Sequence, residues 1–285
     1  MKTLLIGQIH ADAHALLAAN SNLLTLTQAQ FDQTKPLDVH AIAIRTFTPL
    51  QKKQLDLLAH LQYVISCSVG TDNIDLEELK RRNIALIHCP GTNANSVAEH
   101  ALYLLYSVLR EDPHRPYAEL KNKTVGLLGF GYIGKLVAQK LRGCDCNIIA
   151  FDVIEQDQNV LSDLHVTMTS FEDVLSQSDI ISIHVPYNKH TEKLINNKAF
   201  ELIKPKSFFI NTSRAEVIDE EAFMHHTTKF RGIGLDVYSD HLKDKLLQSA
   251  CKNIIFTPHV AAQGEDSFRE QCLRPVEEFV KRIKL

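Results

Sequence analysis

The chain has 285 residues, a formal net charge of −3 and a hydrophobic fraction of 45%. This length predicts two domains of ordinary size, each with its own core. The nearly neutral charge excludes a strongly basic surface for nucleic acid or an anionic membrane, and no apolar run approaches the ~20 residues of a membrane span. The first residues read as a strand rather than a secretion signal, so we expect a cytoplasmic protein.

Six cysteines are scattered along the chain without a C-x-x-C pair. Cys144 and Cys146 lie one residue apart, a spacing that suits neither a structural zinc site nor an easy disulfide. We therefore expect free thiols. No H-E-x-x-H or comparable histidine cluster is present, so no metal site is predicted.

Short apolar runs alternate with helical patterns before residue 95. Strands are expected at 4–6, 41–44, 63–65 and 85–87, and helices at 11–19, 50–59 and 76–82. This alternation predicts a parallel sheet covered on both faces. Because ligands of such sheets lie beyond the carboxyl ends of the strands, the segments that begin at Arg45 and Ser66 are candidates for chemistry.

A long helix is expected after these strands. Ser96 and Glu99 have the S-x-x-E spacing of a capping box, which predicts that the helix starts there and runs through Leu109. Residues 111–116 are expected to end it and lead into the next region.

Residues 124–152 read as a strand, a glycine-rich turn, a helix and a second strand that ends in an acid. Gly129, Gly131 and Gly134 form G-x-G-x-x-G, and Asp152 closes the second strand. Such glycines permit a tight turn, close approach of backbone N–H groups to a pyrophosphate and close packing of helix and strand. Asp152 can accept hydrogen bonds from ribose hydroxyls and would repel a 2′-phosphate, so the stretch predicts an NAD site. The predicted cofactor loop also includes Phe130, Tyr132 and Ile133.

The alternation continues to the end of the chain. Strands are expected at 180–184, 208–211, 233–236 and 254–257, and helices at 171–177, 197–203 and 219–225. With the two strands of the glycine unit this makes six, the number in a complete doubly wound nucleotide domain. Residues 265–284 read as a terminal helix that is interrupted by Pro275 and packs on the first domain.

Seven motifs, in their order and spacing, resemble those of the NAD-dependent D-2-hydroxyacid dehydrogenase family over nearly the whole chain. They are V-G-T-D-N-I-D at 69–75, N-S-V-A-E-H at 95–100, the glycine stretch at 124–134, H-V-P at 184–186 followed by Thr191, I-N-T-S-R at 210–214, L-D-V at 235–237 and T-P-H at 257–259. The resemblance implies two doubly wound parallel-sheet α/β domains. A Rossmann NAD domain (residues 96–262) would be inserted into a flavodoxin-like substrate domain (residues 1–95 plus 263–285).

The resemblance also implies an activity and partners. The enzyme would move hydride between NAD(H) and C2 of a small 2-hydroxy or 2-oxo acid, with D specificity. It would act as a homodimer formed through the long helix from Ser96, without nucleic-acid or membrane partners.

The resemblance assigns roles that the side chains can fill. Arg214 would hold the 2-oxo group and the carboxylate through its planar fork of donors. The backbone N–H groups of Val69 and Gly70 would bind the other carboxylate oxygen. His259 would exchange the hydroxyl proton, and Asp236 would contact the nicotinamide amide. The remaining residues expected beside the cofactor are His184, Val185, Pro186, Thr191, Thr212 and Ser213.

The chain departs from the family pattern five residues after Asp236. The family has a glutamate there, which hydrogen-bonds the catalytic histidine and supports its charged form; this chain has His241, preceded by Asp240. Either Asp240 takes the glutamate's role, which we favour, or His241 serves as a neutral partner, or the relay is impaired. An impaired relay would favour a catalytically weak NAD-binding regulator. A dehydrogenase for formate or phosphite is a further alternative.

A second departure leaves the substrate open. The family commonly has a tryptophan-bearing loop between the long helix and the glycine turn; here this segment is cut to about residues 111–120, and the chain has no tryptophan. The short segment resembles the compact form seen in erythronate-4-phosphate dehydrogenases, without their long C-terminal domain. Arg45 could meet a distal phosphate or carboxylate of the substrate, or it could hold the 46–49 loop. His114 and Arg115 are weaker candidates for the same contact.

Overall fold

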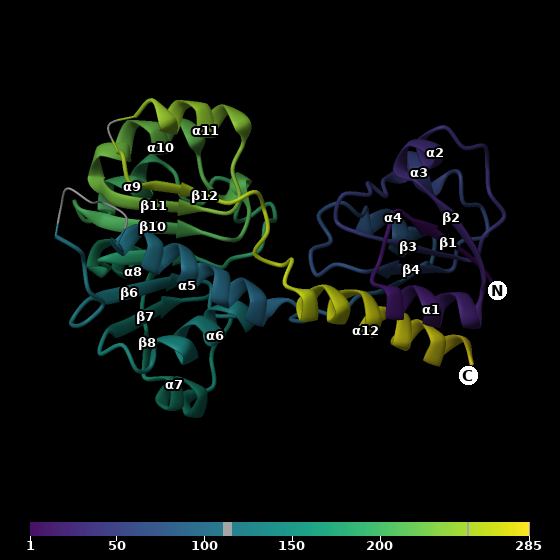
Figure 1. Ribbon diagram of the computed structural model, residues 1–285, viewed down its shortest axis with the longest axis horizontal. Coiled ribbons are helices and arrows are strands. Elements are labelled where there is room, and N and C mark those ends of the chain that lie inside the picture. Colours follow the sequence, from purple (N-terminus) through teal and green to yellow (C-terminus); the bar gives the residue numbers. More distant parts are fainter. Residues whose placement is uncertain (111–115, 250, 285) are drawn as a thin grey trace. The chain divides into compact units, whose positions relative to one another are not determined.

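The structure is a computed structural model that describes residues 1–110, 116–249 and 251–284. The chain divides into two compact units. The first combines Met1–Asn93 with Gln263–Leu285, and the second is Ala94–Ala262. In each unit a parallel sheet carries helices on both faces (Figure 1).

The first unit is built on a five-stranded sheet in the order β2-β1-β3-β4-β5. The strands are β1 (Lys2–Ile6), β2 (Asn22–Leu26), β3 (Ala41–Ile44), β4 (Tyr63–Ser66) and β5 (Ala85–Ile87). The helices are α1 (Ala11–Asn20), α2 (Gln28–Asp32), α3 (Lys52–Leu55), α4 (Leu76–Arg81) and α12 (Glu265–Ile283). This strand order is that of flavodoxin, as expected for the first domain.

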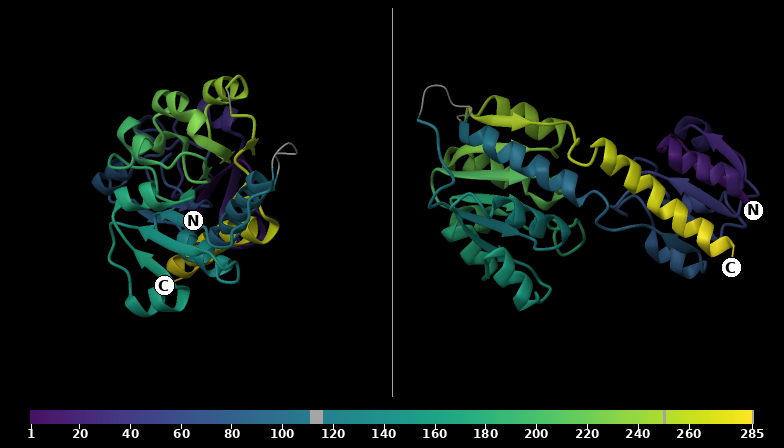
Figure 2. Two further views of the ribbon diagram at one scale, coloured as in Figure 1. Left: turned by 90° about the vertical axis from the view of Figure 1, so that its left-hand side faces the viewer. Right: turned by 60° about the horizontal axis from the view of Figure 1, so that its bottom comes forward.

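Strand alternation divides the interior of this unit into two cores. Leu5 of β1 is buried together with α1 and α12, whereas Leu4 and Ile6 are buried on the opposite face with α2, α3 and α4. Such a division follows from side chains that point alternately to the two faces of a strand. Helices α1 and α12 lie side by side over their face (Figures 1 and 2).

The expected interruption at Pro275 was wrong, because α12 continues through this residue. A proline inside a helix removes one backbone hydrogen bond. Here Pro275 is buried within an apolar stripe that includes Cys272, Val276 and Phe279. Burial of this stripe stabilises the helix and outweighs the loss of one bond.

The second unit is built on a seven-stranded sheet in the order β12-β11-β10-β9-β6-β7-β8. The strands are β6 (Thr124–Leu128), β7 (Asn147–Phe151), β8 (Val166–Met168), β9 (Ile180–Ile183), β10 (Ser207–Asn211), β11 (Phe230–Leu235) and β12 (Ile254–Phe256). The α-helices are α5 (Ala94–Arg110), α6 (Tyr132–Leu141), α7 (Gln158–Leu164), α8 (Phe171–Gln177), α9 (Asn197–Leu202), α10 (Glu220–His226) and α11 (Asp240–Leu247). Two 3-10 turns, η1 (Ala215–Val217) and η2 (Thr227–Lys229), complete it.

The order of these strands confirms the doubly wound class and corrects the strand count. Counted from β6, the sheet reads 3-2-1-4-5-6 with β12 added as a seventh strand. The prediction of six strands was wrong because β8 was missed. This strand has three residues, of which only Val166 is buried, so its sequence carries no clear alternation.

Helices cover both faces of this sheet. Residues of α5, α6 and α7 share one core with it, and residues of α8, α9, α10 and α11 share the other. The direction of the strand order reverses between β6 and β9. In open α/β sheets this switch point, beyond the carboxyl ends of the strands, is where ligands bind.

The predicted capping box was wrong. Helix α5 begins at Ala94, two residues before Ser96. The Ser96 hydroxyl donates a hydrogen bond of 2.7 Å to the carbonyl oxygen of Ala261. The Glu99 carboxylate accepts hydrogen bonds from Asn95 and Lys140. Both side chains thus make contacts other than the cap that their spacing suggested.

Several short elements were not foreseen from the sequence: β2, α2, α7 and α11. The helix expected at 50–59 is reduced to α3, Lys52–Leu55. The predicted helix end at 111–116 falls almost entirely outside the described residues, as do His114 and Arg115. Within the described ranges no helix is long and apolar enough to cross a membrane. All six cysteines are free thiols.

Candidate active site

The glycine turn between β6 and α6 leaves open space where a ligand could approach. Gly129 has φ +96°, and a Cβ there would lie 2.7 Å from the carbonyl carbon of His184. A Cβ on Gly134 would lie 2.3 Å from the carbonyl oxygen of Gly129. A Cβ on Gly131, the residue that precedes α6, would meet nothing within 4 Å. The first and third glycines are therefore required by the protein's own packing, whereas the second leaves room at the N-terminus of α6.

Asp152 lies against this turn at the carboxyl end of β7. Its Oδ2 accepts a hydrogen bond of 2.7 Å from the Phe130 N–H, and its Oδ1 accepts one of 2.9 Å from the Ile154 N–H. A carboxylate has about four acceptor positions, so two remain for ribose hydroxyls. Val153 and Ile154, beside it, are largely exposed.

The ends of β9 and β10 carry two buried polar atoms without a partner in the described part of the chain. They are Nδ1 of His184 and Oγ1 of Thr212. The other ring nitrogen of His184, Nε2, lies 3.0 Å from the Ser182 hydroxyl. A buried polar group left unpaired costs about 1–3 kcal/mol, which a bound ligand with matching groups would offset.

The remaining residues predicted beside the cofactor are held by local contacts. The Thr191 hydroxyl donates to the carbonyl oxygen of Pro186 at 2.6 Å and folds the 186–191 loop. Val185 packs on the core. Both the N–H and the hydroxyl of Ser213 donate to Asn211 Oδ1 at 2.9 Å. Phe130 is buried, whereas Tyr132 is 66% exposed at the start of α6, and Ile133 packs against the core of that face.

Burial lowers the pKa of His184 from 6.5 to about 4. The folded protein therefore keeps this ring neutral at pH values where the unfolded chain binds a proton. We expect His184 to reduce the free energy of unfolding by up to about 2 kcal/mol between pH 7 and pH 5. Chemical denaturation of wild type and of His184→Gln at pH 7 and pH 5 measures this change in the free energy of unfolding. If both proteins lost the same free energy of unfolding between the two pH values, the effect would not come from His184.

A cavity of about 320 Å³ lies beyond the ends of β10, β11 and β12. It brings together Arg214, which follows β10, and His259, which follows β12. The other residues that line it are Ala215, Glu216, Asp236, Val237, Tyr238 and Pro258. Two groups suited to bind and protonate a small polar molecule thus share one site.

The backbone of Arg214 and its guanidinium are both held by neighbouring groups. Asn211 Nδ2 donates a hydrogen bond of 3.0 Å to the Arg214 carbonyl oxygen, and Arg214 Nη1 donates one of 2.8 Å to the carbonyl oxygen of Ser213. These contacts hold a planar group with five donor hydrogens beside the cavity, a donor set that suits a carboxylate.

His259 has a left-handed backbone with φ +55°. Its N–H donates to the carbonyl oxygens of Asp236 at 2.9 Å and Thr257 at 3.0 Å. Left-handed conformations are uncommon for residues other than glycine and cluster at functional sites. The segment after β12 (residues 257–261), which carries His259, is therefore fixed in an unusual conformation.

The carboxylate of Asp236 holds this segment after β12 in place. It accepts hydrogen bonds from the Thr257 hydroxyl at 2.6 Å and from the N–H groups of Val260 and Ala261 at 2.9 and 3.0 Å. His100 of α5 places Nε2 3.4 Å from the same carboxylate and 2.8 Å from Thr257 Oγ1. Burial alone would raise the pKa of Asp236, but these hydrogen bonds outweigh it and lower the pKa. The predicted contact of Asp236 with nicotinamide stays a prediction. Its carboxylate contacts Thr257, Val260, Ala261 and His100.

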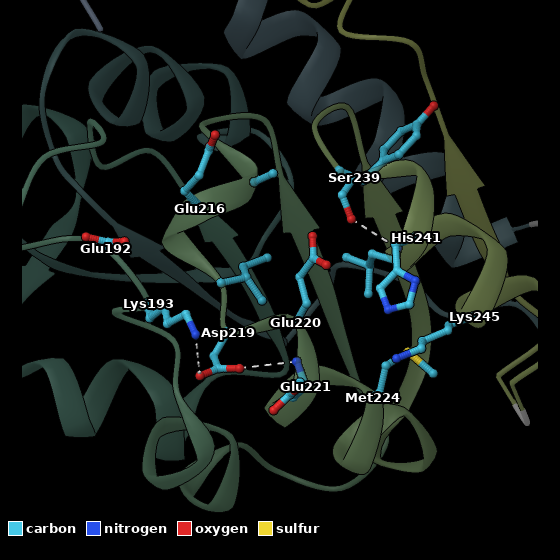
Figure 3. Close-up of a pocket in the computed structure, with 14 residues that line it drawn as sticks. Glu192, Lys193, Glu216, Asp219, Glu220, Glu221, Met224, Ser239, His241 and Lys245 are labelled. Carbon is cyan, nitrogen blue, oxygen red and sulfur yellow. Dashed lines mark hydrogen bonds and ion pairs between the residues drawn. The ribbon is translucent and has the colours of Figure 1, made fainter.

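Asp240 and His241 lie outside the Arg214–His259 cavity. They form the first turn of α11, whose N-cap Ser239 accepts a hydrogen bond of 3.0 Å from the Leu242 N–H, and both side chains are exposed. His241 lines a different cavity, of about 530 Å³, between η1, α10 and α11 (Figure 3). The N-cap signal of Ser239 would have revealed this helix.

In the first unit, the loop after β4 presents the two predicted N–H groups. Hydroxyls of Ser66 and Ser68 bond within this loop. The N–H groups of Val69 and Gly70 donate to no group in residues 1–110, 116–249 or 251–284. Such N–H groups suit an anionic oxygen.

Arg45, at the end of β3, packs its guanidinium carbon 4.6 Å from the ring centre of Phe268, and its buried Nε lacks a described partner. The 46–48 turn is held instead by Asn73 Nδ2, which donates to the carbonyl oxygens of Arg45 and Thr48.

Sequence reasoning gave no role to three residues of the second unit: His100 and Thr257, which contact Asp236 and stand in two of the quoted motifs, and Glu216, which lines the His259 cavity. Glu216 stands two residues after Arg214, a proximity that could have identified it. The partnership of His100 with Asp236 joins residues far apart in the chain and has no sequence signal. Among the described side chains no group of three or more His, Cys, Asp or Glu could hold a metal.

The fold and the site define a dinucleotide-binding α/β oxidoreductase. A glycine turn and an acid lie at the switch point, and an arginine and a histidine share a cavity at the same sheet edge. The chain belongs to the D-isomer specific 2-hydroxyacid dehydrogenases, whose NAD-binding domain matches residues 92–261. It is an NAD-dependent 2-hydroxyacid dehydrogenase, as its motifs predicted.

Relatives extend the similarity beyond this domain. Hydroxypyruvate reductase of Thermotoga maritima is 29% identical over 267 residues, which cover 86% of this chain and 85% of the relative. Glyoxylate reductase of Thermofilum pendens is 33% identical over 230 residues, covering 73% and 68%. The crystal structure of D-lactate dehydrogenase from Aquifex aeolicus with NAD and lactic acid matches with a TM-score of 0.84 and 26% identity, covering 99% and 94%.

Proposed function

We propose that the chain reduces a small 2-oxo acid to the D-2-hydroxy acid with NADH, and catalyses the reverse reaction. The observation that carries the proposal is the shared cavity of Arg214 and His259. The relatives named for hydroxypyruvate, glyoxylate and lactate support acids of this size.

The chain's own residues divide the work of the reduction. Arg214 binds the carboxylate and the 2-oxo group through parallel hydrogen bonds and orients C2. The N–H groups of Val69 and Gly70 have the chemistry to bind a carboxylate oxygen. Bound NADH would supply the hydride to C2. Protonated His259 gives its proton to O2 and becomes neutral, so that the hydroxy acid forms. In oxidation, neutral His259 takes this proton back.

Activity with NADH on a panel of 2-oxo acids tests this proposal. The panel contains glyoxylate, hydroxypyruvate, pyruvate, longer acids and phosphorylated acids, the last to test Arg45 as a distal anion contact. We expect turnover with at least one short acid, a D product by chiral chromatography, and preference for NADH over NADPH because Asp152 would repel a 2′-phosphate. Normal NADH binding without turnover of any acid would instead support the regulatory alternative.

We also propose that the chain acts as a cytoplasmic homodimer through α5. This helix exposes Tyr103 and Tyr106, with 53% and 42% of their surfaces accessible. Exposed tyrosines on a long helix suit an interface, where aromatic side chains are enriched. Sedimentation equilibrium should give twice the mass of the chain for wild type and a lower mass for Tyr103→Glu with Tyr106→Glu; a monomeric wild type would exclude the homodimer.

A further inference from the structure

Helix α5 contacts both ends of the segment after β12. The Ser96 hydroxyl donates to the carbonyl oxygen of Ala261 at 2.7 Å, at the end of the segment. At its start, Nε2 of His100 lies 2.8 Å from Oγ1 of Thr257. Ser96 and His100 are four residues apart in the helix and therefore lie on the same face. One face of α5 thus contacts the segment before and after His259.

The hydrogen bonds around His100 have a fixed direction. Burial opposes ionisation of Asp236, but hydrogen bonds hold its pKa below the usual value, so the carboxylate is ionised and only accepts. The Thr257 hydroxyl donates its one hydrogen to Oδ1 of Asp236 at 2.6 Å. Its oxygen can then only accept a further hydrogen bond, so Nε2 of His100 carries a hydrogen and donates it to Thr257. The same Nε2 lies 3.4 Å from Oδ1 of Asp236.

This network continues to the backbone of His259. The carboxylate of Asp236 accepts hydrogen bonds from the N–H groups of Val260 and Ala261 at 2.9 and 3.0 Å. The carbonyl oxygen of Asp236 accepts the His259 N–H at 2.9 Å. A left-handed residue such as His259, with φ +55°, persists only where surrounding contacts hold it. The contacts of Asp236 with the segment after β12 provide that hold.

His100 acts on this network from a rigid support. Helix α5 packs across β10, β11 and β12 on one face of the sheet (Figure 1). A Cβ on Gly234 of β11 would lie 3.0 Å from Cβ of Leu104, so a glycine lets helix and strand approach closely. Asp236 directly follows β11. The helix that carries His100 and the strand that leads to Asp236 are therefore packed together.

We propose that His100 is a positioning residue that holds the segment after β12, and with it His259, in the catalytic position. This role rests on the proposed function, in which His259 exchanges the hydroxyl proton. A displacement of about 1 Å at a reacting group can cost about 10²-fold in rate. Loss of a hydrogen bond to Thr257, two residues before His259, should therefore slow proton transfer.

Replacing His100 with phenylalanine removes this hydrogen bond and keeps an aromatic ring beside Tyr103, whose ring centre lies 5.4 Å from that of His100. We expect kcat for reduction to fall by about 10–100-fold. KM for the acid and the NADH dissociation constant should change by less than about threefold, because Arg214 and the glycine turn are held by other contacts. His100→Gln, whose amide can donate to the same hydroxyl, should restore most of kcat.

His226 offers a matched control within the same unit. It ends α10, its Nε2 lies 2.9 Å from Oδ1 of Asn197, and its ring stacks on Phe200 with the centres 5.7 Å apart. His226→Phe makes the same substitution beside an aromatic ring, away from the His259 cavity, and should leave kcat unchanged. If both variants lost kcat in proportion to their losses of melting temperature, the effect of His100 would be one of general stability and the proposal would fail.

Amide hydrogen exchange measures the hold on the segment after β12 without turnover. The N–H groups of His259, Val260 and Ala261 should exchange about tenfold faster in His100→Phe, and close to the wild-type rate in His100→Gln. This pattern in a protein that turned over no acid would support the hold and reject only the proposed function. Unchanged exchange in His100→Phe, unchanged kcat in the same variant of an active enzyme, or an equal loss in His100→Gln would overturn the proposal.

Discussion

Replacing His259 with asparagine is expected to lower kcat/KM for 2-oxo acid reduction by about 10²–10⁴-fold, the usual contribution of a general acid. Asparagine is chosen because it tolerates the left-handed region that His259 occupies at φ +55°. The N–H that donates to the carbonyl oxygen of Asp236 is also kept. The variant therefore removes the proton donor and should leave the backbone of the segment after β12 nearly unchanged.

The chain offers a matched control for this variant. His165, the exposed residue that ends α7, has φ +54°. His165→Asn makes the same substitution in the same backbone conformation, away from the cavity. Steady-state kinetics, the NADH dissociation constant and the melting temperature should be measured for both. A His259→Asn enzyme within a few-fold of wild-type activity, with His165→Asn also unaffected, would remove His259 from the proton transfer.

Replacing Gly131 with alanine is expected to weaken NADH binding by about 10–100-fold without destabilising the protein. A Cβ on Gly131 meets no protein atom within 4 Å, so the folded state should tolerate it. It would occupy the space in which a pyrophosphate approaches the N–H groups of the turn. The loss of one hydrogen bond to a charged oxygen, at about 1.5–3 kcal/mol, gives a factor of this order.

Gly143→Ala is the matched control, because a Cβ there also meets nothing within 4 Å. NADH binding by fluorescence titration and thermal unfolding separate the two effects. Gly134→Ala should instead lower stability as well, because its Cβ would lie 2.3 Å from the Gly129 carbonyl oxygen. If Gly131→Ala bound NADH as tightly as wild type, the pyrophosphate could not lie over this turn.

The parts of the fold predicted best from the sequence are those in which local pattern and burial agree. β3, β5 and α8 were predicted with the bounds that the structure has, because each is a compact apolar run or an amphipathic segment with clear ends. The glycine turn was identified because its geometry requires particular residues at fixed spacing.

The errors arose where tertiary contacts override a local signal. The Ser96–Glu99 spacing is that of a cap, but Ser96 binds the carbonyl of Ala261, far away in the chain. Pro275 suggests a break, but the buried stripe around it keeps α12 continuous. At the candidate site, the helical start at Ser239 moves Asp240 and His241 onto an exposed turn. Here the local signal was present, because Ser239 is a typical N-cap residue, but it was not used.

Transfer of deuterium from NADH that carries the label at both C4 hydrogens tests the central claim most directly. Incubation with the best acid of the panel should give a D-2-hydroxy acid with one deuterium at C2, detected by mass spectrometry and NMR, and the His259→Asn enzyme should form it far more slowly. Unlabelled product, or no product from any acid by a protein that binds NADH normally, would contradict hydride transfer to C2.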